Sequence, residues 1–138
     1  MKTVRDVMTK NPVSMSADSS VVDAAKAMSD FRIGSVVVME RDKPCGIVTD
    51  RDITVRAVAT GSDPKSTKLS DICSHDLAAV QPDQSVDDAI KMMKSHDVKR
   101  VVVMSESKLE GIVSLGDLTA RDQGEDVQKD ISKAEPTS

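Results

Sequence analysis

The chain of 138 residues is almost without aromatic side chains, having one phenylalanine, Phe31, and neither tryptophan nor tyrosine. A hydrophobic core must therefore be built from valine, isoleucine, leucine, alanine and the eight methionines. Nucleic-acid binders commonly use aromatic stacking platforms and strongly basic surfaces. This chain has a net charge of −4 and no strongly basic run, so we expect no nucleic-acid partner.

Cysteines and long apolar runs are also scarce. Cys45 and Cys73 are the only cysteines, and they form neither a CxxC pair nor a disulfide framework. Such a pattern is typical of the reducing cytosol, and we expect Cys45 to be a buried or idle thiol. An N-terminal apolar segment and a run of about 18 apolar residues are both missing, which argues against secretion and membrane spanning. We therefore expect a cytoplasmic protein without a membrane partner.

One stretch of the sequence is used twice. Residues 46–53 return as residues 111–118, and the same 65-residue shift overlays residues 4–56 on residues 69–121 with 19 of 53 positions identical. A unit of about 60 residues is marginally stable alone, so two repeats are expected to fold together. We expect repeat 1 over residues 1–60, a linker over 61–67, repeat 2 over 68–122 and an acidic, disordered tail over 123–138.

Each repeat predicts the order helix, short strand, helix, strand, strand, helix. The leading helix is expected over residues 3–9 and to end at Asn11-Pro12, because proline pushes the preceding residue out of the α region. Apolar β-branched runs predict the strands, and helical spacing of apolar residues predicts the helices. The other expected elements are residues 13–15, 20–30, 35–39, 45–49 and 50–59, and then 69–74, 78–80, 85–95, 100–104, 109–114 and 116–122.

Hydroxyl-x-x-acid pairs stand where a strand is expected to pass into a helix: Thr49 with Asp52, and Ser114 with Asp117. One explanation is structural, because this spacing is that of a helix-capping box. The other is functional. A helix N-terminus favours a phosphate, the hydroxyl can donate to that phosphate, and the carboxylate can bind both hydroxyls of a ribose. Spacing alone leaves both explanations open.

The duplicated motif, the runs Gly34-Ser35-Val36-Val37-Val38 and Lys99-Arg100-Val101-Val102-Val103, and the leading Val4-Arg5-Asp6-Val7-Met8 resemble a tandem pair of cystathionine β-synthase (CBS) domains. The chain is similar to small bacterial proteins that contain a CBS pair and little else, over about residues 1–122. The resemblance implies an α/β (α+β) fold of two β-α-β-β-α repeats with pseudo-twofold symmetry, forming one compact pair. It also implies clefts for adenosyl ligands and a homodimer.

Carried onto this chain, the resemblance implies hydroxyls that face phosphate, aspartates that face ribose, and strand edges that face adenine. The first cleft would involve Asn11, Val13, Ile33, Ser35, Thr49, Arg51 and Asp52, and the second Ala78, Val98, Lys99, Arg100, Ser114 and Asp117. The copies differ, because Asp50-Arg51 is replaced by Leu115-Gly116 and Gly34-Ser35 by Lys99-Arg100. We therefore expect two clefts that do not bind alike.

The leading hypothesis is a non-catalytic sensor that binds an adenosine nucleotide of the AMP, ATP, NAD(H) or S-adenosylmethionine type and signals to a separate partner chain. No nucleophile–base pair or metal-ligand set is evident, so catalytic residues, a metal and a required cofactor are not expected. Arg56 and Arg121 follow the two acids by four residues and are expected to form ion pairs with them. The alternative is a structural dimeric scaffold in which the motifs serve only as helix caps.

Overall fold

The computed structural model of the protein describes residues 2–75 and 77–122, with side chains as far as Leu118. The described chain forms two compact units. One is the continuous segment Val13–Leu77, and the other joins Met1–Pro12 to the chain from Ala78 onward. Residues 123–138, for which the sequence predicts a disordered tail, lie outside the described residues. Within the described part, no helix combines the length and the apolar character needed to cross a bilayer.

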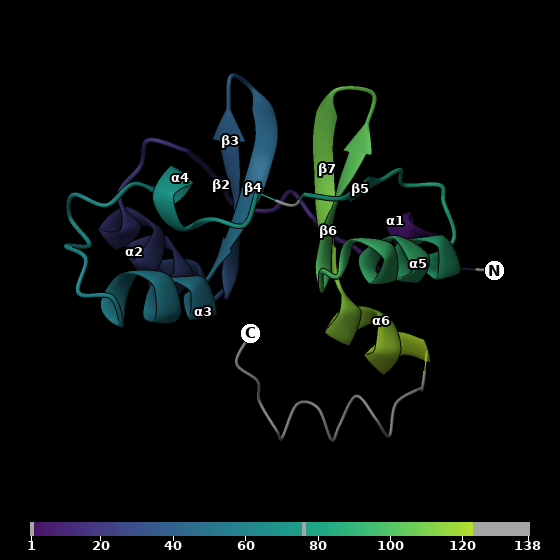
Figure 1. The fold of residues 1–138 in the computed structure, drawn as a ribbon. Helices are drawn as coiled ribbons and strands as arrows, with labels where there is room; N and C mark the ends of the chain where they lie inside the picture. The colour runs from purple at the N-terminus through teal and green to yellow at the C-terminus, as the bar shows by residue number, and fades with distance from the viewer. Residues whose placement is uncertain (1, 76, 123–138) are drawn as a thin grey trace. The chain divides into compact units, whose positions relative to one another are not determined.

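The unit Val13–Leu77 contains a three-stranded sheet and the helices that pack on it (Figure 1). The sheet has the order β2-β3-β4, with β2 parallel to β3 and β3 antiparallel to β4. The strands are β2 (Ser14–Ser16), β3 (Ser35–Glu40) and β4 (Lys43–Thr49). The helices are α2 (Val21–Phe31), α3 (Asp50–Asp52), its π-helical continuation η1 (Ile53–Val58) and α4 (Leu69–Ile72).

The second unit has the same plan with one more strand (Figure 1). Its sheet has the order β1-β7-β6-β5, in which only β5 and β6 are parallel neighbours. The strands are β1 (Thr9–Lys10), β5 (Ala79–Val80), β6 (Arg100–Ser105) and β7 (Lys108–Ser114). The helices are α1 (Val4–Val7), α5 (Val86–His96) and α6 (Leu115–Asp122). The mixed α/β architecture predicted from the sequence is confirmed.

Local sequence determines where the two long helices begin. The Ser20 hydroxyl accepts a hydrogen bond from the Asp23 N–H at 3.1 Å, and the Ser85 hydroxyl accepts one from the Asp88 N–H at 3.0 Å. An N-cap serine satisfies a backbone donor that the first helical turn would leave unpaired. The hydroxyl-x-x-acid motif therefore forms a helix N-cap at Ser20 and at Ser85.

Aliphatic side chains form the core of each unit, as the near absence of aromatics predicts. The only phenylalanine, Phe31, is 63% exposed and takes no part in either core. The central strands supply the runs Val36, Val37, Val38 and Val101, Val102, Val103, all of them buried. Around each run the helices contribute alanine, valine and methionine side chains, so the packing is wholly aliphatic and sulfur-containing.

The leading segment differs from its prediction. A helix was expected over residues 3–9, but α1 ends at Val7, and Thr9 and Lys10 form β1, which pairs with β7 through Thr9↔Ile112 and Lys10↔Gly111. Without β1, the backbone groups at this edge of β7 would lack strand partners. Pairing with them keeps residues 9 and 10 in an extended conformation. The segment that opens repeat 1 thus belongs to the compact unit of repeat 2.

Candidate functional site

The first hydroxyl–acid pair lies where β4 passes into α3. The Thr49 hydroxyl accepts a hydrogen bond from the Asp52 N–H at 3.0 Å, and the Thr49 N–H donates to Asp52 Oδ2 at 2.9 Å. Thr49 is extended and both residues are half-buried. The two residues therefore form a complete capping box that fixes the start of the helix.

The other oxygen of Asp52 faces Arg56. Asp52 Oδ1 lies 3.8 Å from Arg56 Nε, which confirms the ion pair predicted from the four-residue spacing. Arg56 Nη1 also donates to the carbonyl oxygens of Ile72 at 3.2 Å and Cys73 at 3.5 Å. One arginine thus connects the carboxylate of Asp52 to the carbonyl end of α4. The corresponding pair of Asp117 and Arg121 cannot be followed, since the Arg121 side chain lies outside the described part.

The strand edge beside this junction brings further predicted residues together. Ser35 is the register partner of Thr49, and the Asp50 N–H donates to the Gly34 carbonyl at 3.0 Å, so the start of β3 adjoins the start of α3. Val13 accepts a hydrogen bond from the N–H of β3 residue Val37 at 3.0 Å. Val13 and Ile33 both pack, half-buried, against the core of this unit. Arg51, in contrast, is exposed.

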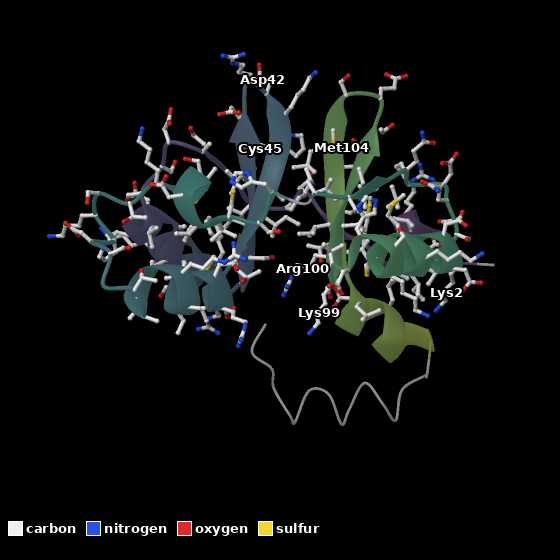
Figure 2. All side chains as sticks on the ribbon, in the orientation of Figure 1. Lys2, Asp42, Cys45, Lys99, Arg100 and Met104 are labelled. Atoms are coloured by element: carbon white, nitrogen blue, oxygen red, sulfur yellow. The ribbon has the colours of Figure 1, made fainter. Side chains whose placement is uncertain are left out.

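The second junction repeats the first with fewer contacts. The Ser114 hydroxyl accepts a hydrogen bond from the Asp117 N–H at 3.1 Å. Asp117 is exposed, and its carboxylate has no hydrogen bond or ion pair with any side chain that the structure describes, that is, as far as Leu118. The Leu115 N–H donates to the Lys99 carbonyl at 2.8 Å, and Arg100 is the register partner of Ser114. Figure 2 labels Lys99 and Arg100 at this end of β6, near the start of α6.

The remaining predicted residues of the second set also lie at this strand edge. Ala78 accepts a hydrogen bond from the Val102 N–H at 3.1 Å and is buried. Val98 donates to the carbonyl of Met93, just before β6 begins, and is half-buried against the core. These positions match Val13 and Ile33 of the first set. The two repeats therefore have the same backbone arrangement at this edge but carry different charged residues, Arg51 in the first and Lys99 and Arg100 in the second.

Asn11 is placed differently from the rest of its predicted set. Its N–H donates to the Glu110 carbonyl at 3.2 Å, within the unit that contains Ser114 and Asp117. Its φ of 49° is in the left-handed region, which asparagine tolerates better than most residues. The structure thus does not bring Asn11 together with Thr49 in one compact unit, because the leading segment has joined the other repeat. A role for Asn11 beside the first cleft stays a prediction.

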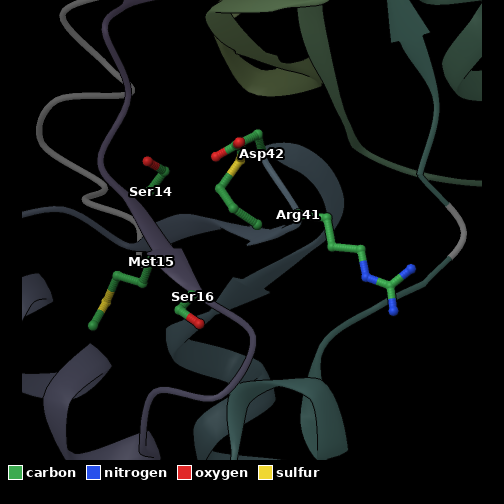
Figure 3. Close-up of a pocket in the computed structure, with 6 residues that line it drawn as sticks. Ser14, Met15, Ser16, Arg41 and Asp42 are labelled. Atoms are coloured by element: carbon green, nitrogen blue, oxygen red, sulfur yellow. The ribbon is translucent and has the colours of Figure 1, made fainter.

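One pocket in the unit Val13–Leu77 has no counterpart among the predicted site residues (Figure 3). It has a volume of about 330 Å³ and lies between β2 and the β3–β4 turn. Glu40 pairs with Lys43 near this turn, while Ser35 pairs with Thr49 at the opposite end of the hairpin. The pocket and the capping box therefore lie at opposite ends of β3. Its lining residues are Ser14, Met15, Ser16, Met39, Arg41 and Asp42.

Both cysteine thiols have raised pKa values. Burial raises the pKa of the Cys73 thiol to about 11, and the neighbouring Cys45 acts in the same direction. Burial also raises the pKa of Cys45. Within residues 2–75 and 77–122, histidine, cysteine, aspartate and glutamate form no group of three that could hold a metal ion.

Comparison with known proteins identifies the family to which this chain is similar. The sequence model of the CBS domain matches the chain twice, at residues 4–58 and 69–124. The CBS domain-containing protein YhcV of Bacillus subtilis is 35% identical over 118 residues, which are 86% of this chain and 84% of that protein.

Two solved structures have the same fold. The crystal structure of Hypoxic Response Protein I with two coordinated zinc ions has a TM-score of 0.73 at 28% identity, and the match covers 86% of this chain and 97% of that one. A hexameric CBS-CP12 protein from bloom-forming cyanobacteria has a TM-score of 0.79 at 25% identity, covering 99% of this chain and 76% of that one. Two matches to the domain model, a close relative and two solved folds agree with the duplicated strand-to-helix junction, and the chain belongs to the CBS domain family.

Proposed function

We propose that this chain is a non-catalytic regulatory module that binds an adenosine nucleotide and signals to a separate partner chain. CBS domains generally bind adenosyl ligands, and small stand-alone CBS pairs are generally regulatory rather than catalytic. The observation that carries the proposal is the hydroxyl–carboxylate pair at a helix start, present in both units as Thr49 with Asp52 and Ser114 with Asp117. The ligand is of the AMP, ATP, NAD(H) or S-adenosylmethionine type.

The second junction suits a ribose with little rearrangement. The Asp117 carboxylate is exposed and is not engaged by any described side chain, so its oxygens can accept from two sugar hydroxyls. The cationic groups Lys99 and Arg100 stand at the neighbouring strand start, where they attract phosphate. Ala78 and Val98 supply the apolar edge against which an adenine would lie.

At the first junction, the carboxylate that would bind the ribose already contacts other groups of the protein. Asp52 Oδ2 already accepts from Thr49, and Oδ1 faces Arg56. A carboxylate has about four lone-pair positions, so ribose hydroxyls can still be accepted, but in competition with these contacts. Exposed Arg51 supplies the cation here, while Val13, Ile33 and Ser35 form the edge. We propose that the two clefts bind with different affinities and that the second binds more tightly.

A second candidate function is favoured by the completeness of the Thr49–Asp52 capping box. In this alternative the chain is a dimeric scaffold, and the motifs serve only to start helices. The two functions differ in what the acids do. A cap contributes to stability alone, whereas a ribose ligand contributes to nucleotide affinity.

The experiment compares Asp117→Asn with the wild type by calorimetric titration with AMP, ATP, NAD and S-adenosylmethionine. A ligand that binds only the native state also raises the melting temperature, which gives a second readout. We expect at least one of these nucleotides to bind the wild type, and its affinity to fall in Asp117→Asn while the melting temperature of the free protein stays nearly unchanged. Full affinity in both Asp117→Asn and Asp52→Asn would support the scaffold instead.

The absorbance spectrum gives a preliminary test. Because the chain has no tryptophan or tyrosine, its own near-ultraviolet absorbance is very weak. An adenine band in freshly purified protein therefore indicates a co-purified nucleotide, and acid extraction followed by mass spectrometry identifies it.

We further propose a cytoplasmic homodimer. In the unit Val13–Leu77 three apolar side chains on α2 and η1, which pack against each other, remain exposed: Phe31 at 63%, Val55 at 45% and Val58 at 64%. Exposed apolar side chains on helices that contact each other favour burial against a second protein surface. Oligomers occur among structures of this fold, such as the hexameric CBS-CP12 protein.

A further inference from the structure

The fold packs both cysteines of the chain on one hydrophobic core. Cys45 and Cys73 stand 28 positions apart in the sequence, and the corresponding positions of the other repeat hold Glu110 and Met8. In the structure Cys73 is 3% exposed within the core of the unit Val13–Leu77, and Cys45 is a half-buried side chain packed against that same core. The pair has no part in the nucleotide site proposed above.

A β-bulge directs Cys45 toward this core. Along the β3–β4 hairpin, Val38 pairs with Gly46 and Met39 pairs with Pro44, so Cys45 is an extra residue in β4. A bulge places two residues of one strand opposite a single residue of its partner and re-aims a side chain. In a regular strand, Cys45 and its neighbour Gly46 would face opposite sides of the sheet. Because of the bulge, Cys45 packs against the core that contains Val38, the pairing partner of Gly46. Figure 2 labels Cys45 on β4.

Cys73 lies directly over the neighbouring glycine. Ile47 and Ser74 exchange two backbone hydrogen bonds of 3.4 and 3.1 Å, which fixes the segment after α4 against β4. A Cβ atom on Gly46 would lie 2.9 Å from Cys73 Sγ and 3.4 Å from Cys73 Cβ. The sulfur therefore occupies the space above Gly46, the residue that directly follows the bulged Cys45.

A base stands beside the buried thiol. Cys73 Sγ lies 3.7 Å from Nδ1 and 3.6 Å from Nε2 of His75, and Nε2 lies 3.1 Å from the Ser70 carbonyl oxygen. When Nε2–H donates to this carbonyl, Nδ1 carries the lone pair that can accept a proton. Burial raises the pKa of both thiols, so the base beside Cys73 helps that thiol to lose its proton and react.

We propose that Cys45 and Cys73 form a reversible intrachain disulfide when the protein meets a peroxide. The more accessible Cys45 sulfur attacks one oxygen of hydrogen peroxide and the O–O bond breaks. The departing hydroxide takes the thiol proton, which yields a Cys45 sulfenic acid and one water. Cys73 loses its proton to His75, and its sulfur attacks the sulfenic sulfur. The S–O bond breaks, and the leaving hydroxide takes the proton back from imidazolium to form the second water. Two thiols lose two protons and two electrons, and one peroxide becomes two waters.

The bond would join two elements that otherwise meet only through backbone hydrogen bonds and packing. It would link β4 to the segment that follows α4, whose Ile72 and Cys73 carbonyls accept from Arg56. Because Arg56 also faces Asp52, oxidation would stiffen the support of the first junction. Cys45 and Cys73 are thus the sensing pair, and His75 is a positioning and proton-accepting residue.

The test treats the reduced full-length protein with an equal amount of hydrogen peroxide, then denatures it in iodoacetamide and measures the intact mass. We expect the wild type to lose about 2 Da, to take up no alkylating reagent, and to regain both thiols with dithiothreitol. A non-reducing peptide map should contain one cross-linked peptide with Cys45 and Cys73. Both cysteines fully alkylated after peroxide, or disulfides found only between two chains, would overturn the proposal.

Two controls separate native proximity from general thiol chemistry. In a glutathione redox buffer, the ratio of disulfide to dithiol should be at least about tenfold higher in the native protein than in the urea-unfolded chain, because only the fold holds the sulfurs together. Equal ratios would show that the fold contributes nothing and would also overturn the proposal. Cys45→Ser should be tolerated, since the matching position in the other repeat is the polar Glu110. This variant should form no intrachain bond.

The role of His75 has its own readout. His75→Gln should slow disulfide formation by peroxide severalfold while leaving the equilibrium ratio in glutathione unchanged. An unchanged rate would remove His75 from the proposed chemistry. A change in both rate and ratio would show that His75 holds the pair in place.

Discussion

Thr49 and Asp52 cap each other, through a hydroxyl that accepts from the Asp52 N–H at 3.0 Å and a carboxylate that accepts from the Thr49 N–H at 2.9 Å. Ser114 and Asp117 keep only the first of these two bonds among the described residues, at 3.1 Å. Among the groups that the structure describes, the same motif is therefore capped by two reciprocal bonds in one repeat and by one bond in the other. This difference leads to the first prediction.

Asp52→Asn should destabilise the protein more than Asp117→Asn. The first change weakens the bond from Thr49 and removes the charge that faces Arg56, so we expect a loss of about 1 kcal/mol in the free energy of unfolding. The second alters an exposed carboxylate and should remain within about 0.5 kcal/mol of wild type. Urea denaturation of the ligand-free proteins measures both, and equal losses would contradict the difference between the two junctions.

Arg56→Gln should lower stability by about 1 kcal/mol, because the carbonyls of Ile72 and Cys73 lose a charged donor. Arg56 is half-exposed, so the ion pair to Asp52 adds little to this value. Arg51→Gln is the matched control, since Arg51 is an exposed arginine in the adjoining helix α3. Its free energy of unfolding should change by less than about 0.5 kcal/mol. If both variants unfold alike, the contact with α4 does not stabilise the protein.

Gly46→Ala should be strongly destabilising, by about 1–3 kcal/mol, because the added methyl group meets fixed atoms. It would lie 2.5 Å from the Ser74 carbonyl oxygen and 2.9 Å from Cys73 Sγ. Gly116→Ala is the control within the other repeat, where the nearest atom is 4.0 Å away and the residue lies in α6. Alanine there should be neutral or should stabilise by up to about 1 kcal/mol. Thermal unfolding of both variants measures the contrast.

Stability should fall as the pH rises from about 9 to about 11, in part through Cys73. Its folded pKa is raised from the ordinary value of 9.0 to about 11, so above pH 9 the unfolded chain releases this proton while the folded chain retains it. The contribution is complete below pH 9 and is lost as the pH passes 11. Cys73→Ala removes it, so the wild type should lose stability more steeply over this interval. Parallel pH curves for the two proteins would contradict the raised pKa.

Phe31→Glu should convert the proposed homodimer to a monomer, because a charge would replace a 63% exposed aromatic on the apolar surface of α2 and η1. Phe31→Leu keeps the apolar character and should remain dimeric. Sedimentation equilibrium of the two variants and the wild type gives the masses directly. A monomeric wild type at high protein concentration would rule out the homodimer.

Much of the candidate site could be predicted from the sequence, because its main contacts join residues three or four positions apart. The spacing of Thr49 and Asp52 offered a cap as one of two explanations, and the structure contains that cap. The four-residue step from Asp52 to Arg56 likewise predicts the ion pair that is observed. The contact between Arg56 and the end of α4 had no sequence signal, because it joins residues 16 and 17 positions apart through a side chain and two backbone carbonyls.

The pocket lined by Ser14 and Arg41 was also missed (Figure 3). Its walls come from an edge strand and a turn, neither of which carries a motif. The position of the turn relative to β2 follows from strand pairing, and strand pairing is decided by the whole sheet.

The sequence by itself determined the duplication, the order of helices and strands apart from β1, the aliphatic core and the caps at Ser20, Thr49, Ser85 and Ser114. Each of these depends on periodicity or on residues three or four apart. Only the tertiary structure decided that the leading segment Met1–Pro12 joins the second repeat. It also decided that Cys73 lies over Gly46 and that Cys45 packs against the core that contains Cys73. Both outcomes depend on which distant strand edge accepts a segment and on where a bulge turns a side chain, and short-range sequence patterns do not specify either choice.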